Sequence, residues 1–277
     1  SIKNKYNVKL LDPSKGLINE LRKEKPDIVF NALHGTYGED GYVQTILESE
    51  KIKYTHSGVY SSSLAIDKEV SKKIFKKNKI LTPPSFKVTS IHKRIQKKII
   101  KKINNSFKFP VVIKPLNEGS SVGVYICNNK NFIKNLYKLK DYNEILVEKY
   151  IPGREIQAAV LGKKKLGAIE LIPSRKFYDY KAKYQKNAKT KHLMPAPLSQ
   201  VNYNKVNDIA LKAHKLLKCR GVSRSDFRFY NSKFYLLELN TQPGMTSLSL
   251  VPEIAKFKNI TFFKLIDFLI KDASINR

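Results

Sequence analysis

Residues 222–249 read "VSRSDFRFYNSKFYLLELNTQPGMTSLS" and decide the fold. Two strand-like runs flank Asn231-Ser232, a suitable pair for a tight hairpin turn. The second run should be buried, yet it carries Glu238 and Asn240 before it breaks at Gln-Pro-Gly. Burying a carboxylate without a partner costs several kcal/mol. Glu238 therefore either lies on a solvated face or meets a positive group.

Period-2 alternation gives each strand of this hairpin one polar face. That face carries Arg224, Asp226 and Arg228 on the first strand, and Leu236, Glu238 and Asn240 on the second. Counting back from the turn, Asp226 comes within about one residue of facing Glu238. Two carboxylates and an amide suit Mg²⁺, which takes one or two carboxylates and completes its shell with water and phosphate. The alternative is a surface ladder in which the two arginines neutralise the acids.

A second motif, "VVIKPLNEGSSVGV" at 111–124, delivers Lys114 at the end of a buried strand and continues into a Gly/Ser loop. Backbone N–H groups in such turns can hold phosphate oxygens, and a fixed lysine adds a positive charge. The spacing is not that of a P-loop, because a strand follows instead of a helix. The alternative is a plain β-hairpin.

A third motif, "ILVEKYIPGREI" at 145–156, joins two lobes and places Glu148 and Glu155 where a cleft would open. Ligand sites favour such boundaries. The alternative is that both glutamates are charges at the rim.

The rest of the chain predicts three lobes. Alternating strands and helices over 1–66 indicate an open α/β layer, in which ligands bind at the carboxyl ends of strands, here near His34. Residues 67–150 predict an α+β lobe and 151–277 a third lobe, with a long aperiodic loop at 174–197 that is typical of a functional segment. The expected elements include a strand at 7–11, a strand ending at His34, helices at 67–78, 91–103, 130–139, 204–219 and 261–271, and the hairpin at 222–239.

Composition narrows the class of protein. The 277 residues carry a net charge of +30, but the lysines are spread along the chain and interleave with Ile and Phe at helical spacing, which favours solvated helix faces over a nucleic-acid site. The basic field would still attract an anionic substrate such as a nucleotide. No apolar run is long enough for a membrane span. Two cysteines in unrelated contexts, and no secretory signal in the sequence, indicate a cytoplasmic protein without a disulfide scaffold.

Taken together and in order, several motifs resemble the D-alanine–D-alanine ligase family of the ATP-grasp superfamily. The resemblance covers the chain from Asp12 to about Leu269, and its motifs are "HGTYGEDG", "YTHSG", "AIDK", "FPVVIKP", "EGSSVGV", "LVEKYIPGRE", "FYDYKAKY", "SRSDF" and "ELNTQPGMTSLS". The resemblance implies a fold of mixed α/β and α+β class, with the three-lobed ATP-grasp architecture and a truncated amino-terminal α/β domain.

The resemblance also implies a role for each candidate residue. ATP would contact Lys68 and Lys114 at its phosphates, the segment Glu148, Lys149 and Tyr150 at its adenine, Glu155 at its ribose, and also Ser121. Asp226, Glu238 and Asn240 would hold two Mg²⁺ (or Mn²⁺) ions. Arg224 and the backbone N–H of Gly244 would stabilise an oxyanion, His34 would lie beside the first D-alanine, and Ser249 with Leu250 would form the carboxylate pocket of the second. The loop 174–197 would be a lid whose Lys183 reaches the γ-phosphate and whose Tyr184 closes on Ser120.

The implied reaction is the ATP-dependent joining of two D-alanines through an acyl phosphate, for peptidoglycan precursor synthesis, with ATP and D-alanine as partners and a homodimer as the assembly. Tyr184 favours the dipeptide over D-alanyl-D-lactate. The alternatives are another ATP-grasp carboxylate–amine ligase that uses D-lactate or D-serine, a degenerate homologue without activity, and a basic nucleic-acid binder.

The resemblance fails at two places. The family begins with a GGxSxExxVS motif, which this sequence does not contain, and the first strand–helix unit is expected to be missing. If the unit is absent, weak binding of the first D-alanine and an exposed sheet edge are expected. Gln242 stands where the family has serine, and this departure looks minor.

Overall fold

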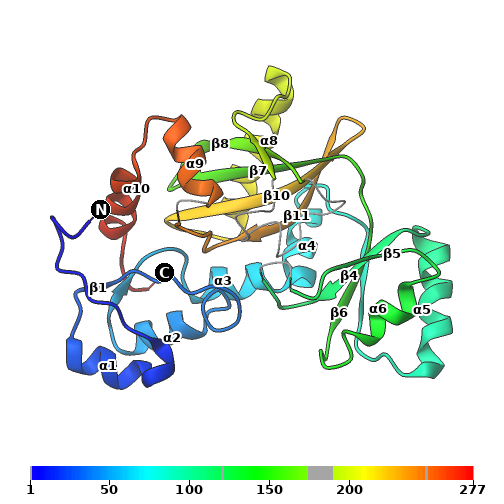
Figure 1. The fold of residues 1–277 in the computed structure, drawn as a ribbon, viewed down its shortest axis with the longest axis horizontal. Helices are drawn as coiled ribbons and strands as arrows, with labels where there is room; N and C mark the ends of the chain where they lie inside the picture. The colour runs from blue at the N-terminus through cyan, green and yellow to red at the C-terminus, as the bar shows by residue number, and fades with distance from the viewer. Residues whose placement is uncertain (1, 120–121, 174–189, 247–248, 277) are drawn as a thin grey trace.

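The computed structural model describes residues 2–119, 122–173, 190–246 and 249–276, which form three sheets of two, four and five strands. Figure 1 shows the two-stranded sheet with α1 and α2 at one end of the molecule and the four-stranded sheet with α5 and α6 at the other. The α/β and α+β expectation is confirmed. The domain bounds 1–66, 67–150 and 151–277 stay predictions.

The amino-terminal lobe is small. Its elements are η1 (Pro13–Lys15), α1 (Leu17–Glu24), β1 (Ile28–Val29), α2 (Tyr42–Ser49), β2 (Lys53–Tyr54) and α3 (Val59–Ile66). β1 and β2 are parallel, and Leu21, Val43, Leu47 and Tyr54 form the buried core. The strand expected at 7–11 is wrong: among the described residues this segment pairs with no strand, and its Leu10 is 92% exposed.

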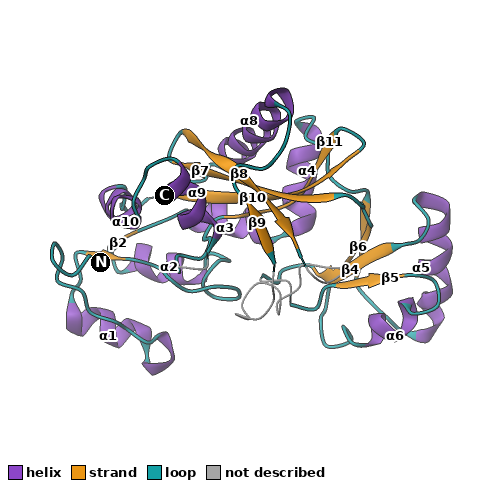
Figure 2. Cartoon of the chain, turned by 45° about the horizontal axis from the view of Figure 1, so that its top comes forward, coloured by secondary structure: helices purple, strands orange, loops and turns teal. Residues whose placement is uncertain are grey.

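The second lobe is the four-stranded antiparallel sheet with the order β3-β6-β4-β5. Its elements are β3 (Ser85–Val88), α5 (Lys93–Ser106), β4 (Val111–Pro115), β5 (Tyr125–Cys127), α6 (Phe132–Tyr137) and β6 (Ile145–Lys149). Figure 2 shows α5 and α6 on the side away from the five-stranded sheet. In α5 the residues Ile99 and Ile103 are buried while the lysines between them are exposed, which confirms the solvated helix face that the sequence predicted.

The third lobe is the five-stranded antiparallel sheet with the order β11-β10-β7-β8-β9. Its elements are β7 (Arg154–Leu161), β8 (Lys164–Ile172), β9 (Lys191–Leu193), α8 (Gln200–Leu216), β10 (Val222–Tyr230), β11 (Lys233–Asn240), α9 (Leu250–Phe257) and α10 (Phe262–Lys271). The sequence did not predict α9. It also treated 174–197 as one loop, whereas residues 191–193 pair with β8 as an edge strand.

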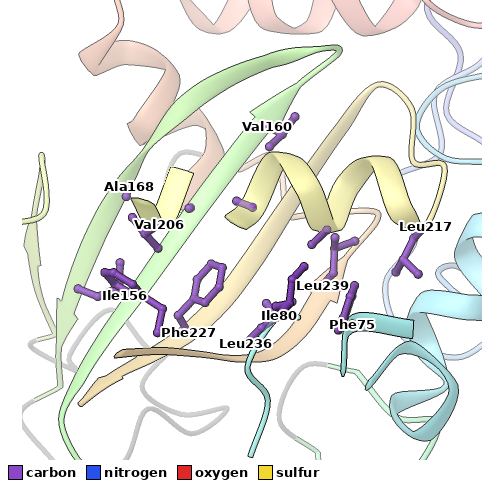
Figure 3. Packing of buried hydrophobic residues seen from close by; sticks show 14 of the residues in the cluster. Phe75, Ile80, Ile156, Val160, Ala168, Val206, Leu217, Phe227, Leu236 and Leu239 are labelled. Carbon is purple, nitrogen blue, oxygen red and sulfur yellow. The ribbon is translucent and has the colours of Figure 1, made fainter. Parts of the chain in front are cut away.

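Both faces of this sheet are buried, because alternate residues of β7 enter different cores. Ala158 and Val160 pack with α8 on one face, and Ala159 and Leu161 pack with α9 and α10 on the other. Figure 3 shows α8 crossing the first of these cores. Phe75 of α4 (Lys68–Lys77) joins that core, so α4 is anchored on the third lobe while its first residue, Lys68, reaches the site described below.

The two ends of the chain tie the first and third lobes together. Lys5 and Tyr6 contact the carboxylate of Asp267 on α10, with Nζ and Oη at 2.5 and 2.7 Å from Oδ1. At the other end, Ser274 forms a β-bridge with Tyr54 of β2. In the described part of the chain, no helix is both long and apolar enough to cross a membrane.

Candidate active site

Two pockets lie side by side and share one wall. The shared wall consists of Lys68, Glu118 and Glu238. The first pocket is also lined by His34, Glu39, Arg224, Asn240, Gly244, Ser249 and Leu250. The second is also lined by Lys114, Glu148, Lys149, Tyr150, Glu155, Asp226 and Arg228. Every candidate site residue that the structure describes therefore lines one of these two pockets.

The hairpin brings Asp226 and Glu238 directly opposite each other. Its two-residue turn lies at Asn231 and Ser232, where the sequence predicted it, and their φ angles of 46° and 56° are those of a type I′ turn. A β-bulge follows Asp226 in the register, and it changes the alternation on β11. Leu236 consequently packs in the core with Leu239, so the expectation that Leu236 shares a face with Glu238 and Asn240 is wrong.

Arginine–carboxylate pairs line the hairpin side of the pockets. Arg224 donates to Asp226 through two bonds, Nε to Oδ1 at 2.7 Å and Nη2 to Oδ2 at 3.0 Å. Arg228 lies 3.3 Å from Glu155 and donates to the carbonyl of Gly153. The arginines do pair with acids, but all four side chains are nearly buried, so the arrangement is a pocket wall and not a surface ladder.

A buried carboxylate between two lysines forms the floor of the second pocket. Lys114 Nζ lies 2.8 Å from Glu148 Oε1, and Lys72 Nζ donates to Glu148 Oε2. Burial opposes ionisation of Glu148, but the two ammonium groups outweigh it and lower its pKa to about 2. Burial also opposes the charge on Lys114, yet Glu148 and Glu238 raise the pKa of that lysine. The strand register explains the contact, because β4 and β6 are neighbours in the sheet.

Lys72 was not among the residues that the sequence singled out. Burial lowers its pKa to about 8, against the opposing attraction of Glu148. Lys72 lies four residues after Lys68 on α4, so the two side chains lie on the same side of the helix. The four-residue spacing of Lys68 and Lys72 was the signal in the sequence that could have identified Lys72 as a site residue.

Lys68 stands on the wall between the pockets. Its ammonium group donates to the carbonyl of Glu118 at 2.5 Å and lies 3.9 Å from Glu238 Oε2. Burial lowers the pKa of Lys68, and the attraction of Glu238 works in the opposite direction. Asp67 caps the helix by accepting the N–H groups of Glu69 and Val70, which fixes where α4 begins and thus where Lys68 lies.

The first pocket has little room at Gly244. A Cβ on that residue would lie 2.7 Å from Ser249 Oγ and 3.9 Å from His34 Nε2, so a larger residue would displace the serine. His34 Nδ1 lies 3.3 Å from Glu39 Oε1, and Glu39 is itself buried. Sequence reasoning passed over Glu39 and Glu118, although both are acidic residues next to glycines in motifs that it quoted.

Of the predicted site residues, Ser120, Ser121, Lys183 and Tyr184 lie outside the described residues, as does most of the predicted lid.

Within the described ranges, no group of three or more His, Cys, Asp or Glu side chains could hold a metal ion. Asp226 and Glu238 with Asn240 offer two carboxylates and an amide oxygen, a set that fits Mg²⁺ when phosphate and water complete the shell.

Comparison with known proteins gives the same family for both parts of the chain. Residues 74–271 match the family model "D-ala D-ala ligase C-terminus", and residues 4–57 match "D-ala D-ala ligase N-terminus". A D-alanine–D-alanine ligase of Pelagibacter ubique is 63% identical over 276 residues, which cover 100% of this chain and 90% of the relative. One from a Wolbachia strain of Drosophila simulans is 42% identical, covering 97% and 84%.

Solved structures of D-alanine ligases have a similar fold. A D-alanine–D-alanine ligase from Bacillus anthracis in complex with ATP has a TM-score of 0.82 at 31% identity, covering 98% of this chain and 87% of that one. The VanG D-Ala:D-Ser ligase of Enterococcus faecalis has a TM-score of 0.78 at 31% identity, covering 88% and 72%. The fold is that of an ATP-grasp enzyme. The chain belongs to the D-alanine–D-alanine ligase family, which confirms the resemblance that the motifs carried.

Proposed function

We propose that this protein joins two D-alanine molecules into D-alanyl-D-alanine while ATP is converted to ADP and phosphate through an acyl phosphate. The observation that carries the proposal is the common wall of the two pockets. A nucleotide in the second pocket and an amino acid in the first would bring a phosphate and a carboxylate together at Lys68 and Glu238. Phosphoryl transfer requires such positioning and neutralisation of charge.

The lysines of the second pocket support ATP as its ligand. Lys114 is kept charged by Glu148 and, with Lys68, would bind the phosphates. The segment Glu148, Lys149 and Tyr150, at the end of β6, would contact the adenine, and Glu155 the ribose. The ATP complex of the Bacillus anthracis relative supports ATP as the nucleotide. Lys183 and Ser121 are proposed as further phosphate contacts.

Asp226, Glu238 and Asn240 would hold the metal, for which we propose two Mg²⁺ ions, or Mn²⁺ in their place. Bound there, the metal would neutralise phosphate charge next to Lys68. The direct opposition of Asp226 and Glu238 supports this role, because the two carboxylates project from paired positions of one hairpin.

The remaining residues account for the two steps of the reaction. The carboxylate of the first D-alanine, beside His34, attacks the γ-phosphate and releases ADP. The amine of the second D-alanine, whose carboxylate lies at Ser249 and Leu250, attacks the acyl phosphate; a proton leaves the amine and phosphate departs. Arg224 and the N–H of Gly244 would stabilise the oxyanion between these events. A guanidinium has several donors in a planar fork, so Arg224 can hold Asp226 and contact the acyl oxygen together.

The proposal also includes a lid, a use for the product and an assembly state. A lid at 174–197 would exclude water from the acyl phosphate, with Tyr184 closing on Ser120. The product would serve peptidoglycan precursor synthesis in the cytoplasm, and the assembly would be a homodimer.

The proposal is tested by measuring ADP release with ATP, Mg²⁺ and D-alanine, and by identifying the dipeptide. D-Serine and D-lactate are offered as second substrates in parallel, since one solved relative is a D-Ala:D-Ser ligase. D-Alanine-dependent ADP and dipeptide formation is the expected result. ADP release that does not depend on D-alanine would overturn the proposal, and a clear preference for D-serine or D-lactate would overturn the second substrate.

A further inference from the structure

The side chain of Gln242 crosses from the third lobe to the first. Gln242 is 2% exposed. Both polar atoms of its side chain, Oε1 and Nε2, form hydrogen bonds across the boundary between the lobes. Its Oε1 accepts from Asn31 Nδ2 at 2.9 Å. Its Nε2 donates to the carbonyls of Asn31 at 3.1 Å and Leu33 at 2.7 Å. These three bonds join residues that lie 209 to 211 positions apart in the sequence.

On the first-lobe side, these bonds hold the loop that carries His34. Asn31 Nδ2 also donates to the carbonyl of Gly38 at 3.1 Å, and Asn31 Oδ1 accepts the N–H of Leu33 at 3.1 Å. Asn31 therefore fixes both ends of the loop. His34 lies inside this loop, directly after the Leu33 carbonyl to which Gln242 donates.

On the third-lobe side, Gln242 is part of the loop that leads to Gly244. Its backbone N–H donates to Asn240 Oδ1 at 2.7 Å. Two residues later, a Cβ placed on Gly244 would lie 3.9 Å from His34 Nε2. The side chain of Gln242 thus lies behind the point where the His34 loop and the Gly244 loop meet, and it does not line either pocket.

We propose that Gln242 is a positioning residue that fixes the His34 loop against the Gly244 loop, and so holds the first D-alanine in line for acyl transfer. The inference rests on the proposed function. A serine at 242 could not reach the Leu33 carbonyl, so the glutamine that looked like a minor departure supplies a joint between the lobes. Small displacements of a positioned substrate are enough to slow a reaction considerably.

The test compares Gln242→Met, which keeps the length of the side chain but removes its hydrogen bonds, with Gln242→Ser, which shortens it. Hydroxylamine, a nucleophile that traps acyl phosphates, replaces the second D-alanine, so that hydroxamate formation reports the first site. Asn207→Ala is the matched control: Asn207 is a buried amide on α8, bonded to the Tyr203 carbonyl at 2.8 Å and outside both pockets. The melting temperature is measured for every variant.

We expect Gln242→Met to lower kcat/KM for D-alanine in the trapping assay by about tenfold or more, with the KM for ATP changed by less than about twofold. Gln242→Ser should act in the same direction, and it decides the matter if the methionine variant does not fold. Asn207→Ala should lower the melting temperature and leave both constants unchanged. An unchanged constant for D-alanine in the Gln242 variants, or equal losses for ATP and D-alanine, would overturn the inference. An inactive wild type would instead overturn the proposed function, and the inference with it.

Discussion

Among single residues, Glu238 is one of the two acids, with Glu118, that line both pockets. The sequence left open whether it lay on a solvated face or met a positive group, and the structure gives it Asp226 across the hairpin and Lys68 at 3.9 Å. Glu238→Gln keeps the shape but removes the charge. We expect turnover to fall by at least about a hundredfold, with little change in melting temperature. ADP release measures the turnover, and thermal unfolding measures the melting temperature.

The control for this variant is Asp208→Asn, which removes a carboxylate that is 62% exposed and pairs with Lys165 away from the pockets. It should leave turnover unchanged. Near-normal turnover of the Glu238→Gln variant would refute a role for Glu238 in the reaction.

Lys72 permits a second prediction at this scale, because it shares Glu148 with Lys114. Lys72→Met removes one of the two charges that hold the carboxylate in place, so we expect the KM for ATP to rise by about tenfold while kcat changes less. Burial lowers the pKa of Lys72 to about 8, so the wild-type KM for ATP should rise as the pH increases through that value. The variant should lack this rise.

Initial rates across a range of pH measure both effects. Lys73→Met is the matched control, since Lys73 is the next residue on the helix but is 71% exposed and pairs with Glu69. Equal KM values for the Lys72 and Lys73 variants would contradict the prediction.

At the scale of elements, the contact of α8 with β10 contains a buried histidine. His214 on α8 lies with Nδ1 2.7 Å from Ser223 Oγ on β10, and burial lowers its pKa to about 4. Because the folded-state pKa lies below the usual 6.5, the stability that the neutral ring contributes is complete above pH 6.5 and is lost as the pH falls through 4. We expect a loss of about 2 to 3 kcal/mol by about pH 4.5 from this group.

Thermal unfolding between about pH 7 and about pH 4.5 measures this loss. His214→Gln should flatten the dependence in that window. His92→Gln, at an exposed helix N-cap, should retain the wild-type dependence. Identical pH dependence for the two variants would show that His214 is not the group responsible.

The elements also show what sequence patterns can predict. The turn at Asn231-Ser232 and the face-to-face acids followed from local chemistry and alternation, and both were found. The bulge after Asp226 was not predicted, because it depends on how β11 packs on the core and not on residue type. Helix α9 was missed although Pro252 lies in its first turn, where a proline costs no hydrogen bond. The three residues of β9 are too few to show a period.

At the scale of the whole molecule, contacts between distant segments are what the sequence could not supply. Motif order predicted which residues gather at the pockets, and each described candidate lines one of them. The contacts between lobes were not predicted, because they depend on how the lobes dock. They are the hydrogen bonds of Gln242 with Asn31 and of Lys5 with Asp267, and the β-bridge of Ser274 with Tyr54. No local pattern marks such residues, so they become visible only in three dimensions.

The net charge of +30 leads to a last prediction, because ATP is an anion and D-alanine is a zwitterion. Positive charge spread over the surface should raise the encounter rate with ATP, and salt should screen it. We expect kcat/KM for ATP to fall by about tenfold between about 0.05 and about 0.5 M ionic strength, and kcat/KM for D-alanine to change little. A matched variant replaces Lys97, Lys98 and Lys101, which are exposed on α5 and line neither pocket, with glutamate. Each change removes two charge units, so the net charge falls from +30 to +24. Its salt dependence for ATP should be shallower, with D-alanine kinetics unchanged. Equal salt dependence for ATP and D-alanine would mean that the surface charge does not guide the nucleotide.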